Sequence, residues 1–532
     1  MAYWVFRQIG LLITACITSL KPLLSPLHGT AQQSSCSDDT TVYQISRNDE
    51  AFRDHVKYFA FKFDNVLDHD LIQSSLKKLL EIDHWRKIGG RIKLNGNGRI
   101  TLHVPKHFDS QNPAFNFHHE KFDMAVSEHT VAAKFPPIKQ TQESMVYPND
   151  DFLATFARTE QAPKSIHEFA KSGSPVLSVL VSSFTDATIV GLCWPHILMD
   201  GLGYSEFLHN WSLVLAGEED KVTKPIDINC DPMWEMADPA RSDIAEEWAL
   251  GRHELQGVDL LWFQLRYLWN TMFISPPERR LIMISNDAFH RLVDNTRLEL
   301  KEWAEEQGES QPPFISDGDI LTGWIMKAAN KHKTSRTSCP TILGQAFNLR
   351  PYLREDFINP PEIAHADVDR KGVYISNMVS AVYTLLPRGF LQDQPVFRIA
   401  LEQRKAVQQQ TEENQVLGLL RHHRETFQRT GKYQPIFGTH DSDLYFVTNA
   451  IKLQLQHMID LSPAIVTDTA EGNSKGITRS NLSSYVSGFQ KLNAVFPGII
   501  ILKGKDQFGN IWLNPTLRRD CWRGVEQEVQ QL

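Results

Sequence analysis

The chain has 532 residues, of which 42% are hydrophobic and 22% are charged, and its formal net charge is −8. These proportions are those of a globular protein with large buried cores, so disorder, collagen and coiled coil are excluded as descriptions of the whole chain. The acidic balance and a mean hydropathy of −0.32 also exclude a general attraction to nucleic acid and a polytopic membrane protein.

Residues 1–41 are predicted to be a leader and linker outside the folded core. Within them, Ile9 to Leu20 is an uncharged stretch with Arg7 before it and Lys21 after it. Twelve helical residues rise about 18 Å, short of the roughly 30 Å hydrocarbon core of a bilayer, so no clear membrane span is expected. A signal peptide or membrane anchor is the alternative for this stretch. The six cysteines form no C-x-x-C pair, which favours a reducing compartment and a cytoplasmic location.

From residue 42 the chain alternates helix-like and strand-like segments. The expected elements are a helix at 70–80 with Asp70 as N-cap, a hairpin at 91–104, strands at 176–181 and 188–194, and a helix at 207–216. Asn95-Gly96-Asn97-Gly98 supplies the turn residues of the hairpin. The second strand of the pair is apolar throughout, which predicts burial on both of its faces.

The pattern loosens between residues 217 and 313, where Trp262 and Trp269 stand among many charges and two Pro pairs. This region is predicted to be an inter-domain connection with its own helices. A second regular region follows, with a capped helix at 316–330 and strands at 341–349, 373–386, 446–451, 498–502 and 511–513. Mixed strands and helices in both halves predict an α/β or α+β protein of two domains, 42–216 and 314–532.

The most informative segment is 194–203, Trp-Pro-His-Ile-Leu-Met-Asp-Gly-Leu-Gly. Pro195 ends the buried strand, so His196 is expected at the edge of the sheet, facing a cleft. Its ordinary pKa near 6.5 suits a general base at neutral pH. On a continuous helix Asp200 would stack beside His196, but Pro195 and the glycines favour a loop that Asp200 braces. By spacing alone, a histidine without catalytic role is the alternative.

His196-x-x-x-Asp200-Gly201 after an apolar strand resembles the signature of the BAHD acyltransferases, in particular their fungal secondary-metabolism relatives. Other segments match that family in the same order. They are Ser74-Ser75-Leu76 through Trp85 to Gly90-Arg91, Ser316 to Thr322, Asn348-Leu349-Arg350, Gly372 to Asn377, and Asp460-Leu461-Ser462 at the position of the family's Asp-Phe-Gly motif. The resemblance extends from about residue 42 to the C-terminus.

The resemblance implies a chloramphenicol-acetyltransferase-like fold, in which two similar domains of mixed β-sheet flanked by helices enclose an active-site tunnel. It also implies transfer of an acyl group from acyl-CoA, most simply acetyl-CoA, to the hydroxyl or amine of a small secondary metabolite. Acyl-CoA would be a co-substrate of a monomeric enzyme that holds no bound cofactor and no metal. The anionic co-substrate predicts a local basic mouth on this acidic protein.

The resemblance further implies that His196 takes the acceptor's proton and that the acceptor attacks the thioester directly. Asp200 would point away from His196 and pair with Arg350, and together with Gly201 these residues would support the catalytic loop. Among possible nucleophiles for an acyl-enzyme, only Cys193 stands near His196 in the sequence, and strand alternation leaves its reach open. A ternary-complex route is therefore expected.

The sequence departs from the family pattern at two places. Asp460 keeps the first residue of the second motif, whereas Phe and Gly are replaced. Upstream, the family's Ser/Thr-x-Trp reads Thr448-Asn449-Ala450 here, so the tryptophan is absent. Thr448, Asn449 or a backbone N–H would then have to stabilise the oxyanion.

Several other functions fit the residues less well. A condensation-type domain with carrier-bound acyl groups normally has two adjacent histidines, whereas Pro195 holds the first position here. A non-catalytic binding protein on the same fold is the remaining alternative. The pairs His118-His119 and His422-His423 are poorly spaced for zinc, and residues 421–425 are expected on a solvated charged face. Gly201-x-Gly203 lacks the third glycine of a dinucleotide loop.

Overall fold

The structure, a computed structural model, describes residues 39–532 apart from internal gaps. The gaps are 97, 149–150, 227–230, 240–246, 271–272, 274–275, 334–337, 354–371, 432–435, 454–458, 467–481 and 491–497. Residues 1–38 of the predicted leader, including Ile9–Leu20, lie outside the described residues, whereas Thr40 and Thr41 already belong to strand β1 (Thr40–Gln44). Among the described helices, none combines the length and the apolar character needed to cross a bilayer.

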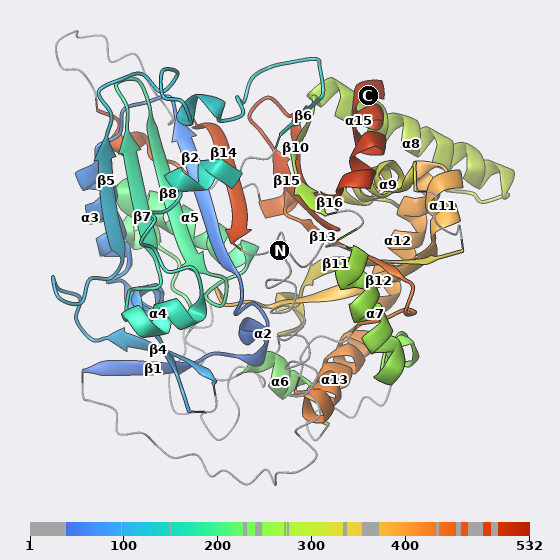
Figure 1. Cartoon of the computed structure of the whole chain (residues 1–532), viewed down its shortest axis with the longest axis horizontal. Coiled ribbons are helices and arrows are strands. Elements are labelled where there is room, and N and C mark those ends of the chain that lie inside the picture. Colours follow the sequence, from blue (N-terminus) through green and yellow to red (C-terminus); the bar gives the residue numbers. More distant parts are fainter. Residues whose placement is uncertain are drawn as a thin grey trace.

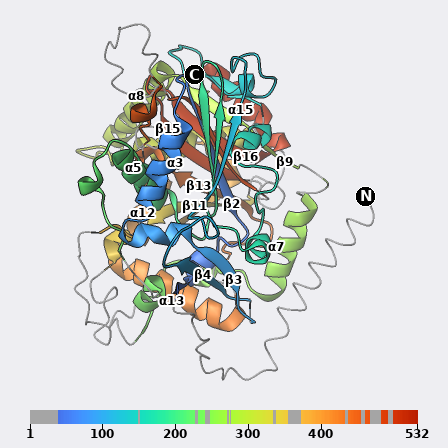
Figure 2. The same ribbon diagram turned by 90° about the vertical axis from the view of Figure 1, so that its left-hand side faces the viewer.

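The first half of the molecule is built on a five-stranded sheet with the order β14-β2-β8-β7-β5. Its strands are β2 (Val56–Phe63), β5 (Asn116–Lys121), β7 (Ser178–Ser183), β8 (Thr188–Pro195) and β14 (Leu482–Gln490). Strand β8 is buried along its whole length and pairs antiparallel with β7, as its apolar sequence predicts. The helices α3 (His69–Leu79) and α5 (Gly201–Leu215) pack against each other beside this sheet (Figure 1 and Figure 2).

A three-stranded sheet lies at the foot of this half, with the order β1-β4-β3 (Figure 1). Its strands are β1 (Thr40–Gln44), β3 (Arg91–Leu94) and β4 (Ile100–Pro105). The predicted hairpin is confirmed, because Leu94 pairs with Ile100 across the turn. Helix α4 (Ile166–Ser172) packs on β3, and the short helix α2 (Arg47–Glu50) leads into β2.

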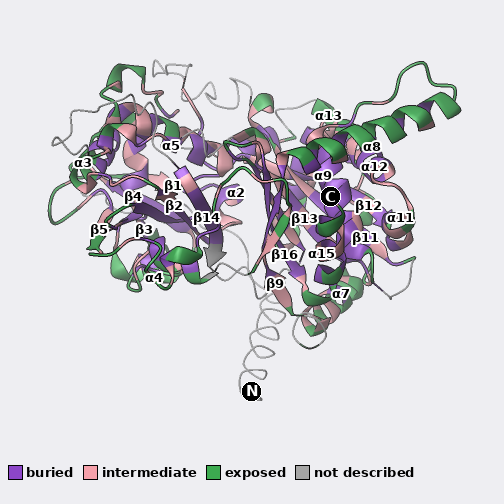
Figure 3. Ribbon diagram, turned by 90° about the horizontal axis from the view of Figure 1, so that it is seen from above, coloured by how far each residue is buried: buried purple, intermediate pink, exposed green. Residues whose placement is uncertain are grey.

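The second half is built on an eight-stranded mixed sheet with the order β12-β11-β13-β15-β16-β10-β6, in which β9 also pairs with β16. The strands are β6 (Met145–Tyr147), β9 (Pro277–Arg279), β10 (Leu281–Ile284), β11 (Pro340–Asn348), β12 (Val379–Pro387), β13 (Asp443–Asn449), β15 (Ile499–Lys505) and β16 (Ile511–Arg518). The helices packed in this half are α8 (Asn286–Glu306), α9 (Asp317–Asn330), α11 (Arg388–Asp393), α12 (Val396–Gln410) and α15 (Trp522–Gln531). Seen from above, the two halves stand side by side, each around its own buried core (Figure 3).

Each half lends a strand to the sheet of the other. Strand β6 comes from the N-terminal half and pairs with β10, while β14 comes from the C-terminal half and pairs with β2. The range 217–313, expected as a connection, supplies β9, β10 and α8 to the second sheet and its core. The described structure therefore divides less simply along the chain than the expected domains 42–216 and 314–532. Pairing between strands far apart in sequence leaves no local pattern from which it could be predicted.

Local expectations also differ from the structure in detail. Helix α3 begins at His69, and the carboxylate of Asp68 accepts its first N–H groups, so Asp68 is the N-cap and the predicted Asp70 is not. Helix α5 begins at Gly201, six residues earlier than predicted. The strand expected at 373–386 begins only at Val379. Before it, Asn377 Nδ2 donates to the carbonyl of His196 and Met378 N–H donates to Asp200, instead of joining the sheet.

The remaining helices lie on the outside of the second half. They are α6 (Pro232–Met236), α7 (Gly257–Trp269) and α13 (Glu413–Thr430). Residues 421–425 belong to α13, where His423 is buried and its pKa is lowered to about 3 by that burial. The prediction that this segment is a solvated charged face is therefore wrong, because α13 packs its histidine side against α6 and the Trp248 cluster.

Candidate active site

His196 lies immediately beyond the end of β8, where two separate segments, 52–55 and the one that carries Asn377, hold it. Its backbone N–H donates to the carbonyl of His55 at 2.8 Å, and its own carbonyl accepts from Asn377 Nδ2 at 2.8 Å. The ring of Phe52 stacks on the imidazole, with centroids 4.6 Å apart and an interplanar angle of 18°. The side chain is only 9% exposed. The two hydrogen bonds thus fix the backbone of His196, and the stacked ring of Phe52 fixes the plane of the imidazole.

The surroundings of His196 keep the imidazole neutral. Burial lowers the pKa of His196 well below its ordinary value, and the positive charges of Lys57 and His55 lower it further. Desolvation also lowers the pKa of Lys57, to about 8, against the opposing influence of Asp200. A neutral imidazole at neutral pH can accept a proton, which is what a general base requires.

Asp200 is the N-cap of α5 and the partner of Arg350. Its Oδ1 accepts from the backbone N–H groups of Leu202 at 3.1 Å and Gly203 at 3.0 Å. Arg350 Nη1 and Nη2 lie 2.9 and 3.0 Å from the two carboxylate oxygens, a bidentate pair, and Met378 N–H donates to Oδ2 at 3.0 Å. These bonds join the start of α5 to the segment before β12, so Asp200 connects the two halves of the molecule.

The glycines of the motif allow this close approach. A Cβ on Gly203 would stand 2.0 Å from the carbonyl oxygen of Ile375, and a Cβ on Gly201 would stand 2.7 Å from a methyl of Leu453. Since real Cβ atoms do not approach backbone oxygens so closely, the first contact excludes every residue except glycine at position 203. The start of α5 can therefore lie directly against the second half.

The sequence patterns did not point to Asp49, Phe52 or Asn377 as parts of the site. Asp49 Oδ1 accepts from both the backbone N–H of Asn377 at 2.9 Å and its Nδ2 at 2.7 Å, while Asn48 Nδ2 donates to the Asn377 carbonyl at 2.9 Å. Burial raises the pKa of Asp49 to about 6. For Asp49 the sequence signal is Ser46-x-x-Asp49, a capping pattern that indicates the start of a helix but no partner across the molecule. For Asn377 it is the family-like segment Gly372 to Asn377, to which no role at the site was given.

Several known proteins of similar sequence are named acetyltransferases or acyltransferases of fungi. O-acyltransferase ausP of Penicillium brasilianum is 31% identical over 481 residues, which cover 89% of this chain and 91% of ausP. Acetyltransferase adrJ of Penicillium rubens is 29% identical over 475 residues, covering 89% and 92%. The chain belongs to the BAHD-type acyltransferases. A further relative, transcriptional regulator calD of Penicillium decumbens, is 27% identical and covers 93% of this chain and 96% of calD. No family model matches the chain.

Solved structures of BAHD acyltransferases share the fold. The structure of F. graminearum TRI101 complexed with coenzyme A and deoxynivalenol superposes with a TM-score of 0.59 at 14% identity, over 92% of this chain and 97% of TRI101. Vinorine synthase superposes with a TM-score of 0.54 at 13% identity, over 94% of each chain. The expected chloramphenicol-acetyltransferase-like fold of two domains is thereby confirmed for this acyltransferase.

Thr448 and Asn449 stand at the end of β13 in this acyltransferase. Asn449 Oδ1 accepts from Ile451 N–H at 3.1 Å, and the turn that follows reaches α5, because Leu453 carbonyl accepts from Ser205 Oγ at 3.3 Å. Both residues are half-buried. Their place at the junction of β13 and α5 is compatible with a contact to the acyl group, which stays a prediction.

Asp460 lies in a different part of the BAHD fold from His196. Its backbone N–H donates to Ser212 Oγ at 2.8 Å, near the C-terminal end of α5, and its carboxylate accepts from the backbone and the hydroxyl of Ser462. Ser212 is eleven residues after Gly201, about 16 Å along the helix. Asp460 therefore closes a turn against α5, away from the reacting groups.

We expect Asp49→Ala to lower kcat roughly 10- to 100-fold. The reason is that a shift of a catalytic group such as His196 by less than about 1 Å can lower the rate by that factor. Without the carboxylate, Asn377 loses the acceptor that orients it toward the His196 carbonyl. Asp49→Asn retains an oxygen that can accept both bonds, so it should restore most of the rate. Steady-state kinetics with acetyl-CoA, on variants whose circular dichroism is native, measure this. Equal kcat for all three proteins would contradict the positioning role.

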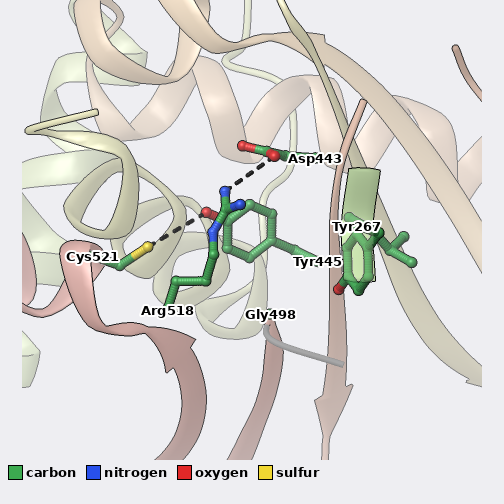
Figure 4. Close-up of a pocket in the computed structure, with 7 residues that line it drawn as sticks. Tyr267, Asp443, Tyr445, Gly498, Arg518 and Cys521 are labelled. Atoms are coloured by element: carbon green, nitrogen blue, oxygen red, sulfur yellow. Dashed lines mark hydrogen bonds and ion pairs between the residues drawn. The ribbon is translucent and has the colours of Figure 1, made fainter. Parts of the chain in front are cut away.

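A cavity in the second half lies at the Asp443 end of β13, whose other end is Asn449. It is lined by Tyr267, Asp443, Leu444, Tyr445, Gly498, Arg518 and Cys521 (Figure 4). Asp443 Oδ2 lies 3.0 Å from Lys333 Nζ and 2.6 Å from Arg388 Nη2, and Oδ1 lies 3.1 Å from Arg518 Nη2. The residues that hold His196 do not line this cavity, which lies beside a cluster of buried ion pairs around Asp443.

Asp443→Asn is expected to destabilise the protein by about 3–5 kcal/mol, because three buried cations lose their shared counter-charge. Burial acts to raise the pKa of Asp443, but Lys333, Arg518 and Arg388 outweigh it and hold that pKa below its ordinary value. A carboxyl group whose pKa is lower in the folded protein stabilises the fold at any pH above its pKa in the unfolded chain, which is near 3.9. This stabilisation is lost as the pH falls below that value towards the pKa of the folded state. Urea unfolding between pH 7 and pH 3 should therefore show a smaller acid loss in the variant.

The matched control for Asp443→Asn is Asp294→Asn on the exposed face of α8. A surface carboxylate contributes little, so this change should leave the free energy of unfolding within about 0.5 kcal/mol of the unchanged protein. Similar losses for both variants would show that the ionic cluster does not stabilise the fold.

Proposed function

We propose that this acyltransferase moves an acetyl group from acetyl-CoA to a hydroxyl group of a small secondary metabolite, with His196 as the general base. The observation that carries the proposal is the neutral, buried imidazole held between Phe52 and Asn377 at the end of β8. The names of the relatives, acetyltransferase adrJ and O-acyltransferase ausP, support the acyl group and the oxygen acceptor.

The proposed reaction has two steps. His196 removes the proton of the acceptor hydroxyl while the oxygen attacks the carbonyl carbon of the thioester, so that a C–O bond forms and the carbonyl oxygen becomes an oxyanion. Thr448, Asn449 or a backbone N–H would donate to this oxyanion. The intermediate then collapses, the C–S bond breaks, and the departing thiolate takes the proton from the imidazolium. The products are the ester, free thiol and neutral His196.

Direct transfer is favoured over an acyl-enzyme by the state of the nearest thiol. Cys193 lies within β8, is 1% exposed, and its pKa is raised to about 12 by burial. A thiol must ionise to act as a nucleophile, and this one remains protonated at neutral pH. Both substrates would therefore have to be bound at once, with acyl-CoA as a co-substrate and no bound cofactor. We further propose that the enzyme is a cytoplasmic monomer, which light scattering and fractionation would test.

The activity is tested by thiol release from acetyl-CoA in the presence of hydroxylated terpenoids or polyketides, with amines as a second acceptor class. We expect release that depends on the acceptor and yields the acetyl ester by mass spectrometry. Release that requires an acylated carrier protein would instead identify a condensation-type enzyme. No release with any acceptor, from protein that binds acetyl-CoA, would contradict the proposed transfer.

A regulatory protein on this fold is the second candidate, because the relative calD is named a transcriptional regulator. The net charge of −8 disfavours direct contact with DNA. The enzyme is favoured because His196 is held in place at the end of β8 and Asp200 is paired with Arg350. Acetyl transfer that is lost with His196 would decide between the two.

A further inference from the structure

The cluster beside the cavity at the Asp443 end of β13 contains more cations than carboxylates. Lys333 Nζ and Arg518 Nη2 lie 3.0 and 3.1 Å from the Asp443 carboxylate, and in the described part of the chain neither has another ion-pair partner. Arg388 Nη2 contacts the same carboxylate at 2.6 Å, and Arg266 Nη1 lies 3.9 Å from it. Three cations in close contact with one carboxylate leave the cluster with an excess of positive charge.

Two further carboxylates lie beside this cluster, but water reaches both of them. Asp441 is half-buried and accepts from Thr439 Oγ1 at 2.7 Å, and Asp520 is exposed. Charges in contact with water are screened, so these two offset the cations only weakly. The side chains of Lys333 and Arg388 are 3% and 2% exposed. Because buried charges are normally paired, the excess calls for a further counter-charge.

The groups that line the cavity are mostly hydrogen-bond donors. Burial raises the pKa of the Tyr445 and Tyr267 hydroxyls and of the Cys521 thiol, so all three keep their protons at neutral pH. Lys333 Nζ donates to the Tyr445 oxygen at 2.6 Å, so the hydroxyl hydrogen points elsewhere. It has Cys521 Sγ at 3.9 Å, a weak acceptor (Figure 4). With the Arg518 guanidinium, this lining suits an anion.

The size and the place of the cavity restrict which anion it can hold. Its empty space is about 230 Å³, part of it open to solvent, which is below the roughly 300–1,000 Å³ of pockets that bury organic ligands. Asp443 and Asn449 stand at opposite ends of β13, about 20 Å apart at the rise of a strand. The cavity therefore suits a small inorganic ion, away from the part of β13 that faces α5.

We propose that this cavity binds a halide ion, such as chloride, between the Arg518 guanidinium and the Tyr445 hydroxyl. The ion accepts from both groups and offsets part of the positive charge that Asp443 leaves uncompensated. It is a structural ligand of the second half and takes no part in acyl transfer. The proposal therefore does not depend on the reaction proposed for His196.

Unfolding of the full chain by urea at pH 7, in sodium chloride and in sodium gluconate of equal ionic strength, tests the proposal. Chloride should raise the folding equilibrium constant by a factor of 1 + [Cl⁻]/Kd, about tenfold when its concentration is ten times Kd. Arg518→Met should lose this response. Arg297→Met, at an exposed ion pair on α8, should keep it, since general salt effects act on both variants alike. Equal chloride responses in all three proteins would overturn the proposal.

A second variant and a direct measurement cover the case in which Arg518→Met does not fold. Tyr445→Phe keeps the ring and the Arg518 charge but removes the hydroxyl, so it should weaken the chloride response. Crystals of the unchanged protein grown in sodium bromide should show anomalous density in the cavity. A cavity without bromide would contradict the assignment, and bromide without a chloride response in unfolding would mean an adventitious ion only.

A phosphate group of the co-substrate is the competing anion. Saturating acetyl-CoA should leave the chloride response of unfolding unchanged, because the cavity is too small for a nucleotide. Loss of the response in its presence would assign the cavity to acetyl-CoA and overturn the halide site.

Discussion

His196→Ala is expected to lower kcat by about 10²–10⁴-fold, because general-base catalysis contributes that factor. The loss should fall on kcat, since the imidazole accepts a proton in the transition state and contributes less to the binding of either substrate. The measurement is thiol release from acetyl-CoA with the acceptor found active. Turnover at the rate of the unchanged enzyme would exclude His196 as the base.

The pH profile gives an independent check on the same residue. Only the neutral imidazole can accept the proton, and burial together with Lys57 and His55 lowers its pKa well below the ordinary value. The rate should therefore stay level as the pH falls through 6.5 and decline only at lower pH. An exposed histidine, His118 on β5, offers the control, and His118→Ala should leave both the rate and the profile unchanged.

Asp200→Ala is expected to lose activity through the fold, with a cost of about 3–5 kcal/mol in the free energy of unfolding. The substitution leaves the Arg350 guanidinium buried without its counter-charge and also removes the N-cap of α5, which adds about 1 kcal/mol. Urea unfolding measures the first effect, and kcat per folded molecule separates it from catalysis.

The partner substitution makes this prediction sharper. Asp200→Ala combined with Arg350→Met removes both members of the pair, so the double variant should lose less stability than the sum of the two single changes. Strict additivity, together with a native free energy of unfolding for Asp200→Ala, would mean that Asp200 acts on His196 and not on the fold.

The sequence could predict the elements whose signals are local. The buried strand β8, the hairpin of β3 and β4, and the capped helix α9, where Ser316 Oγ and Asp319 satisfy each other's backbone N–H groups, all follow from patterns within a few residues. His196 could be singled out in the same way, because strand, proline and glycines stand beside it in the chain. The pairing of Asp200 with Arg350 came only through the resemblance to a family, since 150 residues separate them.

What the sequence by itself determined was a candidate general base, His196, and the local structure around it, whereas the type of reaction followed from the resemblance to a family. The tertiary structure alone decided which distant groups hold the imidazole. Phe52, Asp49 and Asn377 meet at His196 because β2 pairs with β8 and because the segment before β12 reaches across to α5. It also decided that β6 and β14 exchange sheets. These features depend on strand register and packing across hundreds of residues, whereas caps, turns and periodicity are set by neighbours three or four residues away.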